Sequence, residues 1–278
     1  MVKVIERILV PAGLLAALLI VGYALATAAD RELILAVVPL AFLLVLSGLE
    51  LGFGRWRPRL RTCLRDSLCL TIGGGLDAAA RILVAWLALA LGGPGFGPAA
   101  WLPVWVALPL GLLAADFGAY VVHRVFHARP FLWRVHALHH HPDELYALMS
   151  SVNGPLMIFI VRAVPIALLV LLGFSAEVAF AYALIDAWIG LVQHTGVDTR
   201  NPWLAKLLMT PEVHRLHHSA DPAHAGNYAL MFCLWDRVFG TYVAPREQVP
   251  TPGLAEPDAL AATWLGLLLL RRPARRES

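Results

Sequence analysis

Residues 116–141 of the chain read DFGAYVVHRVFHARPFLWRVHALHHH and contain six of its eleven histidines. His123 and His127 lie four residues apart, a separation that places both side chains on one face of a helix. A second set with i, i+3, i+4 spacing also shares a helix face and consists of His136, His139 and His140. The stretch therefore predicts two helical segments that each present several imidazoles on one side.

The HxxHH spacing recurs at residues 214–218. Imidazole is a metal ligand that stays neutral at pH 7, and one ion with four ligands cannot use so many histidines, whereas two ions with four or five each can. The sequence thus predicts a dinuclear site. The nine predicted ligands are His123, His127, His136, His139, His140, His194, His214, His217 and His218.

The predicted ligand set contains no carboxylate. The Glu-x-x-His motif of soluble di-iron proteins does not occur in the chain. Neutral ligands leave more positive charge on the metal ions, which lowers the pKa of bound water and suits oxygen chemistry beside an apolar pocket. Whether His141 and His224 bind metal is left open. His141 lies one residue past the helix face of the HxxHH motif and is expected to point away from the site. His224 could be a lid or supporting residue.

Asp116 and Tyr120 share the helix face of His123 and His127 by spacing. A carboxylate or phenol at these positions could accept the second ring N–H of a ligand and fix its tautomer. The alternative hypothesis is that Asp116 is only a polar residue at the membrane edge and has no role in the site. Both remain open at this stage.

The composition places the chain in a membrane. Hydrophobic residues make up 59% and charged residues only 15% of the 278 residues, and the net charge of +3 is too small to indicate nucleic-acid binding. Four apolar runs are long enough to cross a bilayer, and two more form a hydrophobic hairpin. These runs are 8–29, 33–53, 68–91, 103–122, 156–174 and 178–192.

Five arginines between residues 55 and 65 predict the orientation, because short basic loops stay on the cytoplasmic side. Counting crossings from this loop brings all the predicted ligands to the same side. We therefore expect an all-α membrane bundle of four main spans and a helical hairpin, with a cytoplasmic histidine-rich metal-binding cap. The arginine-rich, lysine-poor composition favours a bacterial inner membrane as the location.

Charged residues inside the apolar runs need partners, because an unpaired charge at that depth is costly. Arg162 and Asp186 lie twelve residues on either side of Phe174, so an antiparallel hairpin predicts a salt bridge between them. Asp77 and Arg81 are four residues apart and form either a self-satisfying ion pair or a polar element near a substrate path.

Five segments carry a resemblance to a known family. They are DFGAYVVHRVFH, LWRVHALHHH, VQHTGVD, TPEVHRLHHS and NYALMFCLWDRVFGTY. Together they resemble the fatty acid hydroxylase and sterol desaturase superfamily of membrane di-iron enzymes, over residues 110–245. Residues 1–109 are then the N-terminal transmembrane helices, and residues 246–278 hold an interfacial helix, at 259–270, and a basic tail.

The resemblance implies two Fe ions held by the nine histidines, O2 as co-substrate, and hydroxylation or desaturation of a C–H bond in a membrane lipid such as a sterol or fatty acyl chain. It also assigns Asn227 and Asp236 to the support of the ligands, a role that spacing alone suggests for Asp116 and Tyr120. Two departures stand out. Ala229 replaces a usual Gly, and residues 153–155 read Asn-Gly-Pro where relatives often carry His-Pro.

No flavin, nicotinamide or haem-domain motif is visible, so electrons are expected from a separate donor, a ferredoxin or a b-type cytochrome with its reductase. The first alternative is a zinc-dependent membrane lipid hydrolase or isomerase, since histidine clusters also bind zinc. The second is a metal or haem carrier, which the position of the histidines at the ends of the spans argues against. The sequence leaves the identity of the lipid open.

Overall fold

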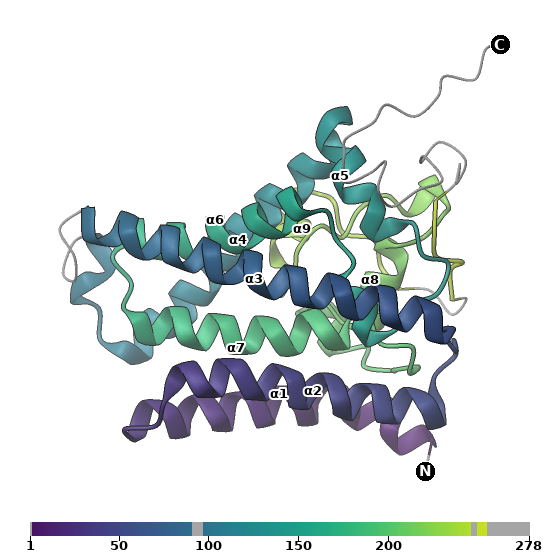
Figure 1. Cartoon of the computed structure of the whole chain (residues 1–278), viewed down its shortest axis with the longest axis horizontal. Helices are drawn as coiled ribbons and strands as arrows, with labels where there is room; N and C mark the ends of the chain where they lie inside the picture. The colour runs from purple at the N-terminus through teal and green to yellow at the C-terminus, as the bar shows by residue number, and fades with distance from the viewer. Residues whose placement is uncertain (1, 91–96, 246–248, 255–278) are drawn as a thin grey trace.

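The computed structural model describes residues 2–90, 97–245 and 249–254. These residues form helices joined by turns and isolated bridges, and no strand occurs among them, which confirms the all-α prediction (Figure 1). The helices are α1 (Val2–Ala26), α2 (Arg31–Phe53), α3 (Leu60–Ala90), η1 (Pro98–Trp101), α4 (Val104–Ala128), α5 (Pro130–His140), η2 (Ala147–Ser151), α6 (Pro155–Leu172), α7 (Ala176–Val192), η3 (Leu204–Lys206), α8 (Pro211–His217), η4 (Pro222–His224) and α9 (Leu234–Val238).

Five helices are long and apolar enough to cross a bilayer, namely α1, α2, α3, α4 and α6. Most of their residues are not buried within the protein, so their apolar side chains face outward, as expected for surfaces solvated by lipid. The helix α7 is slightly shorter and is largely buried. A helix that is apolar on all sides belongs in the interior of such a bundle.

The helices α6 and α7 form the predicted hairpin in chain order but do not pack mainly on each other. Their connection contains Gly173 in the left-handed conformation, with φ of 84°. From there α6 packs on α3 and α4, while α7 packs on α1, α2 and α4. The reason is that α7 is apolar all round and therefore occupies the centre of the bundle, where several helices can cover it.

The segments that the crossing count assigns to the predicted cytoplasmic side lie together at one end of the bundle. Near the N-terminus the carbonyl of Glu6 accepts from the backbone N–H of Arg200 at 2.8 Å, and Arg55 N donates to Gly196 O at 2.8 Å. At the opposite end, Arg31 pairs with Glu177 at 2.7 Å. The short helices α5 and α8 lie at the first of these ends, above and beside the long helices (Figure 1).

The helix α3 begins earlier than expected, at Leu60 rather than residue 68. Pro58 ends the preceding extended segment, and nothing after it prevents helix formation. Arg61 and Arg65 therefore lie on the first turns of α3, where long side chains can reach water beyond the apolar part of the helix. The expected interfacial helix at 259–270 and the basic tail lie outside the described residues.

The predicted salt bridge between Arg162 and Asp186 is confirmed and is part of a larger network. The Arg162 guanidinium also lies 3.7 Å from a carboxylate oxygen of Asp77, and Asp77 pairs with Arg81. The network therefore joins α3, α6 and α7 and balances two positive with two negative charges. The prediction that Asp77 and Arg81 form an ion pair is confirmed, and Asp77 has Arg162 as a further partner.

The network predicts strongly non-additive stability effects. Asp186→Ala should lower the free energy of unfolding by on the order of 2 kcal/mol, below the ~3–5 kcal/mol expected when a buried charge loses its whole partner, because Arg162 keeps the Asp77 carboxylate at 3.7 Å. Unfolding midpoints in detergent would be followed by tryptophan fluorescence. The double variant Arg162→Ala with Asp186→Ala should lose less than the sum of the single variants. Additive losses would show that the two charges do not interact.

Candidate metal centre

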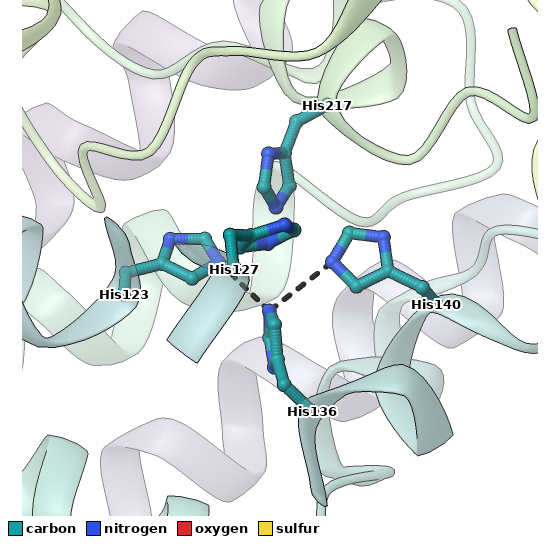
Figure 2. Close-up of side chains that lie close together, drawn as sticks. All are labelled: His123, His127, His136, His140 and His217. Carbon is teal, nitrogen blue, oxygen red and sulfur yellow. Dashed lines mark hydrogen bonds between the residues drawn. The ribbon is translucent and has the colours of Figure 1, made fainter. Parts of the chain in front are cut away.

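All nine predicted ligand histidines converge in two groups at the cap end of the bundle. Within each group the potential ligand atoms lie within 4.8 Å of one another. The five-histidine group consists of His123, His127, His136, His140 and His217 (Figure 2). The four-histidine group consists of His139, His194, His214 and His218.

The two HxxHH motifs divide between the groups in a crossed manner. In α5, His136 and His140 belong to the five-histidine group while His139 belongs to the other. In α8 and the residue after it, the outer pair His214 and His218 belongs to the four-histidine group. The middle histidine, His217, joins the five-histidine group. Each motif thus serves both groups, because residues i and i+4 lie one above the other on a helix while i+3 is displaced sideways.

The spacing of the ring nitrogens fits metal ions better than hydrogen bonds. His136 Nε2 lies 2.9 Å from His123 Nε2 and 3.1 Å from His140 Nε2. His214 Nε2 lies 2.9 Å from His194 Nε2 and 3.0 Å from His218 Nε2. A neutral imidazole has a single N–H, so one nitrogen cannot satisfy two such neighbours through hydrogen bonds.

A shared cation accounts for the same distances. Two nitrogens each about 2.1 Å from an ion are ~3.0 Å apart at a right angle and ~3.4 Å apart at the tetrahedral angle. The observed spacing of 2.9–3.1 Å fits the right angle of five- or six-coordinate sites. Two further inward nitrogens, Nε2 of His127 and of His217, are buried and have no hydrogen-bond partner. These residues therefore fit a pair of metal ions.

Burial keeps the cap histidines uncharged. It lowers the pKa of His139 to about 4 and that of His217 to about 3, and it also lowers the pKa values of His194 and His214. Neutral imidazole is the form that binds a metal ion, so these rings need to lose no proton at pH 7. Neither group contains a carboxylate.

Backbone carbonyls hold four of the rings in place. The Nδ1 atoms of His123 and His217 lie 2.7 Å from Tyr228 O and 2.8 Å from Gly226 O. Those of His139 and His194 lie 3.0 Å from Val152 O and 2.7 Å from Gly190 O. Because a carbonyl can only accept, Nδ1 carries the proton and Nε2 presents its lone pair to the centre of the group.

Asp116 and Tyr120 do not accept a ring N–H, so that expectation is wrong. The Asp116 carboxylate accepts from the backbone N–H groups of Met231 and Phe232 at 2.8 and 2.9 Å. The Tyr120 hydroxyl lies 3.2 Å from Thr241 Oγ1. Both side chains precede His123 on α4 and meet residues 231–241 instead of the imidazoles.

Asn227 and Asp236 act on the same loop. Asp236 accepts from Tyr228 N at 2.8 Å and Ala229 N at 2.9 Å, while Asn227 accepts from Val243 N at 2.8 Å. Asn227 is also the one described non-glycine residue with positive φ, at 56°. All four supporting residues therefore shape residues 226–243, whose carbonyls at 226 and 228 hold two of the histidines.

Two charged residues that the sequence reasoning did not single out anchor the loop after His194. Glu50, at the end of α2, accepts from Thr195 Oγ1 and Gly196 N at 2.9 Å each and from Ala147 N at 2.8 Å. Arg215 donates to Thr195 O and Val197 O at 2.9 and 2.7 Å. The sequence offered a signal for each residue. Glu50 is a lone acid at the end of an apolar run, and Arg215 lies between two predicted ligand histidines.

The two histidines left open lie outside both groups. His141 is exposed, and His224 Nδ1 lies 2.8 Å from Ser219 Oγ.

The two departures from the family pattern have local explanations. Ala229 is fully buried beside Asp236, and a side chain at Gly154 would meet Val135, so the start of α6 approaches α5 closely.

Comparison with known proteins identifies relatives of the region that carries the histidines. The model of the family described as Fatty acid hydroxylase matches residues 108–241. The ornithine lipid hydroxylase OlsE of Rhizobium tropici is 37% identical over 155 residues, which cover 54% of this chain and 45% of that protein. The alkylglycerol monooxygenases of Danio rerio and Homo sapiens are 34% and 32% identical, over 56% and 52% of this chain and 34% and 32% of their own lengths.

The match therefore spans less than half the length of each of these three relatives. No solved structure matches the chain.

The grouping predicts how metal content responds to substitution. His214→Ala removes a nitrogen that faces two others of the four-histidine group, so the purified protein should retain about half of the metal of the unsubstituted chain, measured by inductively coupled plasma mass spectrometry. His141→Ala, outside both groups, is the matched control. Equal metal content in the His214 variant and the control would contradict the assignment.

Glu50 should affect the four-histidine group without touching it. Glu50→Ala leaves three donors beside His194 without an acceptor, and Glu50→Gln restores an acceptor of the same size. We expect metal loss on dialysis against a chelator to be faster in Glu50→Ala and close to normal in Glu50→Gln. Identical loss rates in all three proteins would exclude this positioning role.

Proposed function

Because the chain belongs to the fatty acid hydroxylase superfamily, we propose that it is a membrane monooxygenase that hydroxylates a C–H bond of a membrane lipid. The observation that carries this proposal is the pair of carboxylate-free histidine groups at the end of an apolar helical bundle. The paired sites suit oxygen activation, and we propose that the apolar surface of the bundle brings a lipid chain to them.

In this proposal the nine histidines are the ligands of two iron ions. Iron in such a site supplies the oxidation of an unactivated C–H bond by O2. The number of imidazoles, five in one group and four in the other, supports iron over the zinc alternative, because catalytic zinc sites typically have three protein ligands. The zinc hydrolase or isomerase remains the competing function that an experiment has to exclude.

The contribution of the chain is to hold and shield the reacting centre. Backbone carbonyls fix the Nδ1 protons, so the ligand lone pairs are aimed before any substrate arrives. Trp133 packs 5.0 Å from the ring of His127 and 5.4 Å from that of His140, and Tyr228 lies 4.9 Å from His127. These aromatic rings line one side of the five-histidine group and help to exclude water.

The proposed reaction needs a separate electron donor. Hydroxylation by O2 places one oxygen atom in the product and reduces the other to water, which consumes two electrons and two protons. The chain shows no flavin, nicotinamide or haem motif, so we propose that a ferredoxin or a b-type cytochrome with its reductase delivers the electrons. The orientation proposed from the basic residues 55–65 places this delivery on the cytoplasmic side of the bacterial inner membrane.

The relatives suggest the class of substrate. Their names specify an ornithine lipid and alkylglycerols, both lipids that carry a polar head and an apolar chain. We propose an amphiphilic membrane lipid of this kind, while a sterol or a simple fatty acyl chain remains compatible with the same site. Desaturation begins with the same hydrogen abstraction, so the ligand set does not separate it from hydroxylation. We propose residues 110–245 as the catalytic part of the chain.

Lipid mass spectrometry under 18O2 tests the proposal. Cells that express the chain should accumulate a lipid heavier by one 18O atom, and cells that express His136→Ala should not, because that ring lies within 3.1 Å of two other ligand nitrogens. His141→Ala should retain the product. A loss of two hydrogens would indicate desaturation. Lipid turnover without O2 by a zinc-containing sample would establish the competing function.

A further inference from the structure

The cap carries an exposed surface that combines apolar and basic side chains, here called the interfacial patch. It consists of Trp203, Lys206 and Leu207 around η3 and of Leu234, Arg237 and Val238 on α9. Trp203 is 77%, Leu207 65% and Val238 60% exposed. Large apolar side chains exposed to this extent on a polar cap indicate a surface that contacts something other than water.

The two halves of the interfacial patch form one continuous surface. The backbone N–H of Cys233 donates to Leu207 O at 2.9 Å, and Arg237 Nε donates to Lys206 O at 3.0 Å. On α9, Leu234 and Val238 are four residues apart and share a face. The turn at η3 and the helix α9 therefore hold their exposed side chains beside one another.

The interfacial patch lies between the ends of two spanning helices. On one side, Arg200 N donates to Glu6 O near the start of α1. On the other, Phe239 stacks on Tyr120 of α4, with ring centroids 5.4 Å apart and planes 16° apart. Residues that flank the patch are therefore tied to α1 and α4, the helices whose cap-side parts contact the cap here.

The side-chain chemistry of the patch matches a lipid headgroup region. Tryptophan and basic residues concentrate at this depth, where an amphipathic ring meets water and cations meet lipid phosphates. Lys206 Nζ lies 4.3 Å from the Trp203 ring, and Arg237 lies 3.9 Å from the Tyr242 ring. Among the described residues no carboxylate pairs with Lys206 or Arg237, so both charges are available to an anion.

We propose that the interfacial patch is inserted in the headgroup region of the bilayer and binds anionic lipid. This contact holds the cap, and with it both histidine groups, at the membrane surface. It depends on the spanning helices and not on the proposed oxidation. An acidic soluble protein would also suit the two cations, but the exposed Trp203, Leu207 and Val238 favour an occupant that offers an apolar phase as well as negative charge.

Spin labels on single cysteines measure the depth of the patch in nanodiscs. Labels would be placed by Leu207→Cys and Val238→Cys in a Cys63→Ser background, since Cys69 and Cys233 are buried. Leu44→Cys, exposed on the spanning helix α2, serves as the lipid reference, and Ala223→Cys, exposed on η4, serves as the water reference. Accessibility to O2 and to a water-soluble nickel chelate would be compared by power saturation.

We expect the ratio of O2 to nickel accessibility at positions 207 and 238 to exceed that at position 223 severalfold and to approach that at position 44. The ratio should rise when phosphatidylglycerol is added to phosphatidylcholine. Lys206→Gln with Arg237→Gln should abolish that rise, while Arg59→Gln with Arg61→Gln, which removes the same charge elsewhere, should not. Labels at 207 and 238 that match position 223 would overturn the proposal and leave the patch as a surface for a soluble partner.

Discussion

The structure depends on nine neutral imidazoles, eight of them buried and His127 half-buried, that face one another across two centres. Such a cluster is unfavourable by itself, because buried ring nitrogens lose water and several find no hydrogen-bond acceptor. Metal ions would compensate this cost, and backbone carbonyls already compensate part of it at His123, His139, His194 and His217.

The helical bundle supplies the fixed points for this arrangement. The helix α4 carries two ligands directly, and the central helix α7 delivers His194 to the same end. Glu50 at the end of α2 holds the loop after His194, although it lies outside the region that matches the family. The N-terminal helices therefore do more than anchor the chain in lipid, because they also brace one of the two histidine groups.

Much of this organisation could be predicted from the sequence, because it depends on local periodicity. Spacing identified the histidines that converge, and equal distances from Phe174 identified the pairing of Arg162 with Asp186. The crossed division of the two HxxHH motifs could not be predicted, since it depends on how α5 and α8 approach each other. The direct partners of Asp116 and Tyr120 were missed for a similar reason, because a backbone N–H offers no signal in the sequence.

We propose that two ions are held by imidazole nitrogens alone among the protein ligands. X-ray absorption at the metal edge of the purified protein measures this most directly. We expect scattering from imidazole rings at about 2.1 Å and no sulfur in the coordination sphere, with two iron atoms per chain by elemental analysis of the same sample. A single tetrahedral zinc, or a metal bound by cysteine sulfur, would contradict it.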